Sequence, residues 1–220
     1  MKLNNKKVNI LFATNFGFIF LSLITFVATK FDYTIFGWLS WNIFLAVIPL
    51  WFALMAVKFK KTKLLLALFL LLWFLFFPNS LYLVTDFFHM GDFAYFPPTM
   101  VSAYPWTRLV YITIAYIIGT MAGLVSLNII HRELLNKLSK FKQNALLGIY
   151  FLLSGFALFI GRFPRINSWD VINPPKLINK VVNSMNPFAV VFIIIMTIYI
   201  AFSYVGYLMF CEKNIYEVEK

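Results

Sequence analysis

LLLALFLLLWFLFFPNSLYLVTDFFH, residues 64–89, contains the longest apolar run of the chain and most of its unusual polar groups. Every residue from Leu64 to Phe77 is apolar, and the polar side chains follow only after Pro78. A helix needs about 20 largely apolar residues to cross the roughly 30 Å hydrocarbon core of a bilayer. This stretch therefore predicts a transmembrane helix over about residues 64–84 that carries polar groups at its end.

The rest of the 220-residue chain repeats this pattern. Hydrophobic residues make up 62% of it and charged residues only 12%, whereas roughly a quarter of a soluble domain is charged. Six stretches are long and apolar enough to span a lipid bilayer: residues 8–29, 35–57, 64–84, 109–130, 145–161 and 188–210. We therefore predict a single all-α membrane domain, a bundle of six transmembrane helices.

Two shorter amphipathic segments predict helices that lie in the membrane interface. Residues 131–144 place leucines and Phe141 on one face and lysines on the other. Asn173 followed by Pro174 is a typical N-cap and first helical residue, and apolar residues then repeat at helical spacing up to Met185. Asn186 and Pro187 repeat the same start signal before the last span.

The charges predict the orientation of the bundle. Thirteen of the nineteen basic residues lie in the two terminal segments and in the loops around residues 58–63 and 132–142. Basic residues accumulate on the cytoplasmic side of membrane proteins, so both termini are predicted to be cytoplasmic. This arrangement also accounts for the net charge of +11 without a nucleic-acid partner, and none is predicted.

Four polar side chains after Pro78 fall on one face if the helix continues. At 100° per residue Asn79, Tyr82, Asp86 and His89 share a stripe about 80° wide, and apolar residues occupy the opposite half. Polar and ionisable groups are costly against lipid. We therefore expect this stripe to face the interior of the bundle at its extracytoplasmic end.

Asp86 and His89 are the candidate catalytic residues, because a carboxylate and an imidazole at positions i and i+3 can act as an acid/base pair. The alternative is structural, with Asp86 binding loop backbone as a helix cap and His89 lying among lipid headgroups. Two ligands are too few for a metal centre, and the chain has one cysteine and no H-E-x-x-H motif. No metal site and no cofactor is predicted.

A second polar cluster, GRFPRINSWD at residues 161–170, follows the fifth predicted span. Arginine binds carboxylates and phosphates through two parallel hydrogen bonds. Its arginines therefore either pair with an aspartate (Asp86, Asp92 or Asp170) to tie two hairpins together or bind an anionic headgroup. The residues predicted to contact a substrate are Asn79, Tyr82, Arg162, Arg165, Asn167 and Asp170.

The strings FPNSLYLVTDFFH (residues 77–89) and GRFPRINSWD (residues 161–170) resemble the signature segments of a bacterial family catalogued as domain of unknown function 1361. The resemblance implies a multi-pass protein of the bacterial plasma or inner membrane. It transfers no catalytic or binding residue, because no activity is assigned to the family.

Three functions are compatible with these residues. The first is an enzyme that acts on a lipid or lipid-linked anionic substrate at the extracytoplasmic face. The second is a transporter or channel that uses the polar cluster as its outer vestibule, in which case Asn15 and Asn42 inside the spans would also matter. The third is a non-catalytic assembly or sensory component of the membrane.

Overall fold

The computed structural model describes residues 35–93, 103–166 and 172–210, together with Asn9, Ala13, Phe16, Gly17 and Phe20 of the first segment. These ranges fold almost entirely into helices, which confirms the all-α prediction. The helices are α2 (Ile35–Lys58), α3 (Lys63–Tyr82), the 3-10 helix η1 (Leu83–Phe93), α4 (Ala103–Leu134), α5 (Lys140–Arg162), α6 (Pro174–Ser184) and α7 (Pro187–Phe210).

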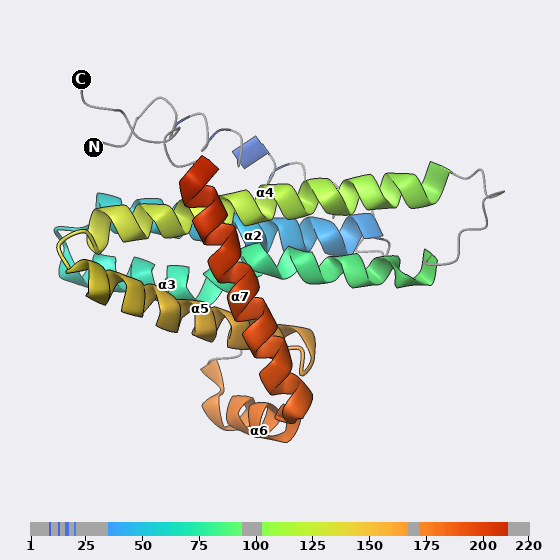
Figure 1. Ribbon diagram of the computed structural model, residues 1–220. Helices are drawn as coiled ribbons and strands as arrows, with labels where there is room; N and C mark the ends of the chain where they lie inside the picture. The colour runs from blue at the N-terminus through green and yellow to red at the C-terminus, as the bar shows by residue number, and fades with distance from the viewer. Residues whose placement is uncertain are drawn as a thin grey trace.

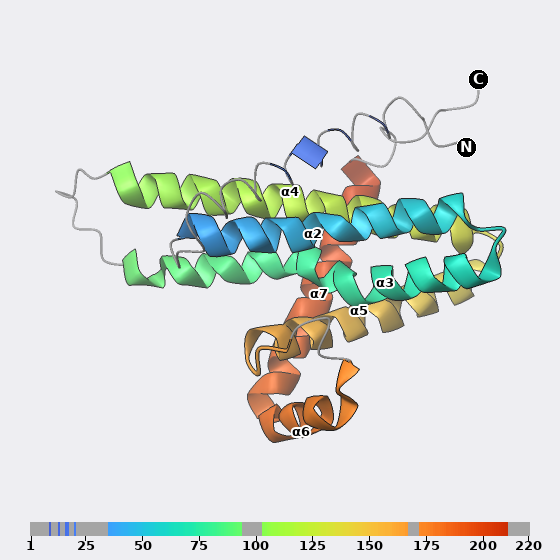
Figure 2. The same ribbon diagram turned by 180° about the vertical axis from the view of Figure 1, so that it is seen from behind.

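Helices α2, α3 and α4 lie side by side and form one group, and α5 packs against α7 (Figure 1). α7 crosses the other long helices obliquely, as both views show (Figures 1 and 2). The short helix α6 lies to one side of the bundle. η1 and the first part of α4 extend together beyond the ends of α5 and α7. We call this end of the molecule the η1 end, and the end at which α4 turns into α5 the turn end.

Five helices within the described ranges are long and apolar enough to cross a membrane. These candidate spans are Trp38–Lys58, Lys63–His89, Trp106–Leu134, Lys140–Arg162 and Pro187–Phe210. They indicate a lipid bilayer as the environment of the protein. The predicted first span, residues 8–29, lies almost wholly outside the described residues.

The predicted interfacial helix over residues 131–144 is wrong. α4 continues to Leu134, and α5 begins at Lys140 after a short turn. Ser139 is the N-cap of α5, and its hydroxyl accepts a hydrogen bond from the backbone N–H of Lys142. The segment is therefore a tight connection in which Lys137 lies in the turn and Lys140 and Lys142 lie in the first turn of α5. The fifth span is 23 residues long rather than the short span predicted over residues 145–161.

The predicted helix after Asn173 is confirmed as α6. The Asn173 side chain accepts a hydrogen bond from the backbone N–H of Lys176, and Pro174 occupies the first turn. Asn186 caps α7 in the same way, because its side-chain oxygen accepts from the N–H of Ala189 at 2.9 Å.

α3 packs against α4 and α5 through buried residues. Phe77 is fully buried, and the rings of Trp73 and Tyr150 stack with centroids 4.8 Å apart, which joins α3 to α5. Trp73 also donates its indole N–H to the buried hydroxyl of Ser126 on α4 at 3.0 Å. Gly123 lets α4 approach α3 closely, because a Cβ placed there would meet the Cβ of Ser80 on α3 at 2.5 Å. These contacts fix α3 up to the point at which its polar segment begins.

Candidate functional site

Pro78 shapes the site because it interrupts the hydrogen bonding of α3 from within the helix. A proline has no N–H, so the carbonyl four residues earlier, that of Phe74, loses its helical partner. The hydroxyl of Tyr150 on α5 donates to this carbonyl at 3.5 Å. Asn79 donates its side-chain amide to the carbonyl of Phe76 at 2.9 Å. Side chains thus satisfy part of the backbone that the proline disturbs.

After Tyr82 the helix changes from α to 3-10, which differs from the continuous α-helix of the prediction. In a 3-10 helix residues at i and i+3 eclipse each other. Asp86 and His89 therefore lie along one face of η1, in closer alignment than the α-helical spacing predicts. That face is directed at α2 and at the end of α5, as the contacts of both side chains show.

Asp86 is buried, with only 1% of its surface exposed. Its carboxylate accepts a hydrogen bond from the side-chain amide of Asn42 on α2 at 3.1 Å. The contact is between side chains of two helices, so the predicted alternative in which Asp86 caps loop backbone does not describe it.

His89 is exposed and has partners from three helices. Its Nε2 lies 3.3 Å from Nη1 of Arg162 on α5, and its ring centroid lies 4.7 Å from that of Trp38 on α2. Arg108 of α4 donates to its backbone carbonyl at 2.8 Å. A guanidinium group has no acceptor, so Nε2 of His89 must accept, and the imidazole is neutral with its proton on Nδ1.

Arg162 contacts His89 and forms no ion pair with Asp86, which was one of the pairs possible under the structural alternative. Among the described side chains the guanidinium makes no ion pair within 4.0 Å, and it lies over the ring of Phe88 at 5.9 Å. Arg165 is exposed and has a left-handed backbone (φ 54°) in the turn that ends α5. Asn167, Asp170 and the side chain of Asp92 lie outside the described residues.

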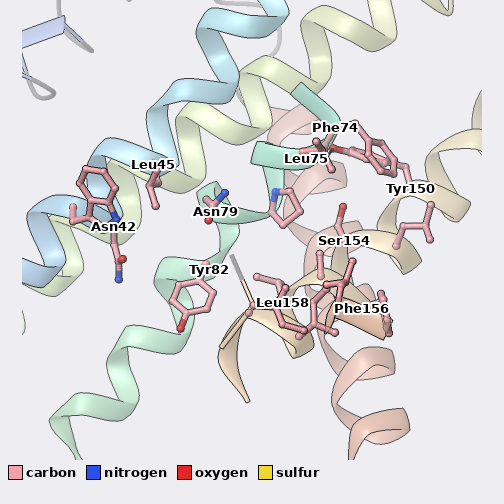
Figure 3. Close-up of a pocket in the computed structure, with 18 residues that line it drawn as sticks. Asn42, Leu45, Phe74, Leu75, Asn79, Tyr82, Tyr150, Ser154, Phe156 and Leu158 are labelled. Carbon is pink, nitrogen blue, oxygen red and sulfur yellow. Dashed lines mark hydrogen bonds between the residues drawn. The ribbon is translucent and has the colours of Figure 1, made fainter. Parts of the chain in front are cut away.

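A cavity of about 400 Å³ lies beside this cluster, between α3 and α5 and against α2 (Figure 3). Its polar lining includes Asn42, Asn79 and Tyr82, whereas most of the wall is aliphatic or aromatic. The cavity adjoins both polar contacts, because Asn42 also binds Asp86 and the lining residue Gly161 precedes Arg162. Pockets of about 300–1,000 Å³ with apolar walls and a few polar groups are typical of small-molecule sites.

The structure thus shows two separate contacts, Asp86 with Asn42 and His89 with Arg162, and none of Asp86, His89 and Arg162 lines the cavity itself. Within the described part of the chain no third His, Cys, Asp or Glu joins Asp86 and His89. The groups suit proton transfer and the binding of an anion.

The family model described as "Protein of unknown function (DUF1361)" matches residues 41–202, which is most of the chain. The chain belongs to this family. The match includes Asn42, Asp86, His89, Arg162 and every described wall of the cavity. No curated protein and no solved structure matches the chain. Membership of this family therefore assigns no reaction to the chain.

Three residues of the site escaped the sequence analysis as members of it. Asn42 stood out only as an amide inside an apolar span, which usually indicates a hydrogen bond between helices. Nothing in the sequence distinguishes Trp38 and Tyr150 from the other aromatic residues, which make up 20% of the chain. Only the packing of α2 and α5 against α3 identifies them as partners.

Proposed function

We propose that this protein is a membrane enzyme that acts on the anionic head of a lipid or lipid-linked substrate at the η1 end. The observation that carries the proposal is a largely apolar cavity that adjoins two polar contacts, Asn42 with Asp86 and Arg162 with His89. An apolar wall suits a hydrocarbon chain, and a guanidinium group suits a phosphate or carboxylate.

In the proposed reaction Arg162 binds the anionic head and His89 transfers the proton. The guanidinium group occupies the lone pair of His89 Nε2 in the structure described above. An anion is a stronger partner for arginine than a neutral imidazole, so a bound substrate would draw Arg162 away and free Nε2 to act as a base. Asp86, held by Asn42, would contribute the second protonatable group.

The orientation follows from the charges. Basic residues concentrate at the turn end and in the terminal segments, so we place the turn end in the cytoplasm and the η1 end outside it. A bacterial plasma or inner membrane is the environment that the family resemblance implies.

The test is lipid turnover by purified protein reconstituted in nanodiscs made from a bacterial lipid extract. Liquid chromatography with mass spectrometry would follow all lipid species over time. We expect one species to change with wild-type protein, and Asp86→Asn or His89→Ala to slow that change at least about 100-fold, since general acid–base catalysis contributes factors of this size.

Glu133→Gln is the matched control, because it also turns a carboxylate into an amide but lies at the turn end. It should turn lipid over at the wild-type rate. A lipid profile that is the same for wild type, Asp86→Asn and His89→Ala, with all three proteins folded, contradicts the proposed enzyme. Size-exclusion elution and thermal unfolding of each variant would establish folding.

A further inference from the structure

The cavity extends well beyond the polar cluster. On α3 its lining runs from Phe74 to Tyr82, and on α5 from Tyr150 to Gly161. At 1.5 Å per residue these segments are about 12 Å and about 16 Å long. The cavity is therefore elongated along the two helices, a shape that fits a chain better than a compact polar molecule.

The polarity of the lining changes along this length. Asn79 and Tyr82 on α3 lie towards the η1 end, whereas Phe74, Leu75 and Tyr150 line the other end, with Ser154 as one further polar group (Figure 3). A ligand that matches both parts has a hydrocarbon chain and a polar head, with the head towards Arg162.

Two apolar side chains of the cavity lining are also exposed on the surface of the bundle. Phe74 on α3 is 40% exposed and Leu153 on α5 is 43% exposed, and both line the cavity. Both helices are candidate membrane spans, so these side chains face hydrocarbon when the protein is in a bilayer. The lining of the cavity therefore includes apolar side chains that lipid chains contact in a bilayer.

Positive charge lies next to the polar end of the cavity. Arg162 follows the lining residue Gly161, and Lys176 precedes the lining residue Leu177 on α6. Arg165 is exposed in the turn between them. These charges favour an anionic head over a zwitterionic one.

We infer that the cavity between α3 and α5, which we call the groove from here on, binds one hydrocarbon chain of an anionic bilayer lipid. This lipid enters sideways from the membrane. The position of the head beside His89 and Arg162 rests on the proposed function, whereas the position of the chain does not. Pro78, which interrupts the hydrogen bonding of α3, itself lines this groove.

The experiment uses phosphatidylglycerol that carries a diazirine in one acyl chain, in vesicles containing the full-length protein. After illumination, peptide mass spectrometry would locate the cross-links. We expect them at residues 74–82 and 150–161, and about fivefold less labelling there with phosphatidylethanolamine of the same chain.

Ala157→Phe places a ring in the cavity from a half-exposed position and should lower the labelling at least fivefold. Ala145→Phe is the matched control, because Ala145 is exposed on the same helix and does not line the cavity. Labelling that Ala157→Phe leaves unchanged, or that is no stronger in the groove than on the exposed face of α7, would overturn the inference.

Asp86→Asn separates the two proposals. If it stops turnover but keeps the groove labelled, both stand. If the groove is labelled and turnover is independent of Asp86, only the enzyme proposal fails. If turnover needs Asp86 and Ala157→Phe changes neither labelling nor turnover, only the groove proposal fails.

Discussion

The two ends of the bundle both carry a histidine, but they use it differently. At the turn end His131 binds the hydroxyl of Tyr204 at 2.7 Å and the side-chain oxygen of Gln143 at 3.0 Å. Gln143 in turn donates its amide to the carbonyl of Leu138 at 2.8 Å. Every group in this network has a protein partner, and the network ties α4, α5 and α7 together.

At the η1 end the polar groups meet beside a cavity instead. His89 is exposed, and its ring nitrogen is paired with a cation that would bind an anion more strongly. The difference indicates that a closed hydrogen-bond network serves stability, whereas polar groups next to a cavity are free to exchange partners with a ligand.

The largest contrast should come from the two histidines. If His89 transfers the proton as proposed, His89→Ala should reduce lipid turnover at least about 100-fold, and it should leave thermal stability nearly unchanged because His89 is exposed. His131→Ala should do the reverse, with loss of stability and nearly normal turnover in the folded fraction. If both variants lowered turnover equally, His89 and His131 would not have the different roles that we assign to them.

Pro78→Ala tests whether the kink makes the site. Proline in a helix interior is about 3 kcal/mol less favourable than alanine, so the variant should be more stable. A straighter α3 should narrow the cavity and reduce turnover and groove labelling about tenfold. Pro49→Ala in α2 is the control, since Pro49 is also inside a helix but does not line the cavity. Full turnover with Pro78→Ala would show that the kink is dispensable.

Gln143→Ala tests the turn end without changing a charge. It removes the hydrogen bonds of Gln143 to His131 and to the Leu138 carbonyl, and one such hydrogen bond contributes about 0.5–1.5 kcal/mol. Denaturation in mixed micelles should show this loss, whereas Asn144→Ala, at the exposed neighbouring position, should leave stability within about 0.5 kcal/mol. An unchanged stability of Gln143→Ala would mean that the network is not a structural tie.

The smallest effect is expected at the Lys60–Glu133 ion pair, which has an N–O distance of 3.4 Å and a lysine side chain that is 49% exposed. Exposed pairs contribute about 0–1 kcal/mol and are screened by salt. Lys60→Ala should therefore change stability by less than about 1 kcal/mol, and 1 M salt should abolish the difference. A larger loss of stability, or a loss that 1 M salt leaves unchanged, would mean that this pair stabilises the fold more than an exposed ion pair should.

The sequence identified candidate residues but not their contacts. Asp86, His89 and Arg162 were identified because ionisable residues at the end of an apolar span are rare and costly. Their partners depend on which helices pack together, so the pairing of Arg162 with His89 and of Asn42 with Asp86 could not be derived from spacing along one helix. The change to a 3-10 helix after Tyr82 was missed for the same reason, because no residue there is specific to that geometry.

The turn between α4 and α5 shows a further limit of pattern analysis. Amphipathic spacing at residues 131–144 predicted a helix, but the tie of His131 to Gln143 and the cap at Ser139 require a reversal of the chain there. Hydrogen bonds formed after packing outweigh a local periodicity of this length.

The most direct test of a lipid site at the η1 end is an electron cryomicroscopy map of the protein in phosphatidylglycerol nanodiscs, with a bound antibody fragment to aid alignment. We predict continuous chain density between Phe74 and Leu153, leading to a head group at Arg162 and displacing its contact with His89. An empty or closed groove, with the Arg162–His89 contact intact in the presence of lipid, would contradict the account.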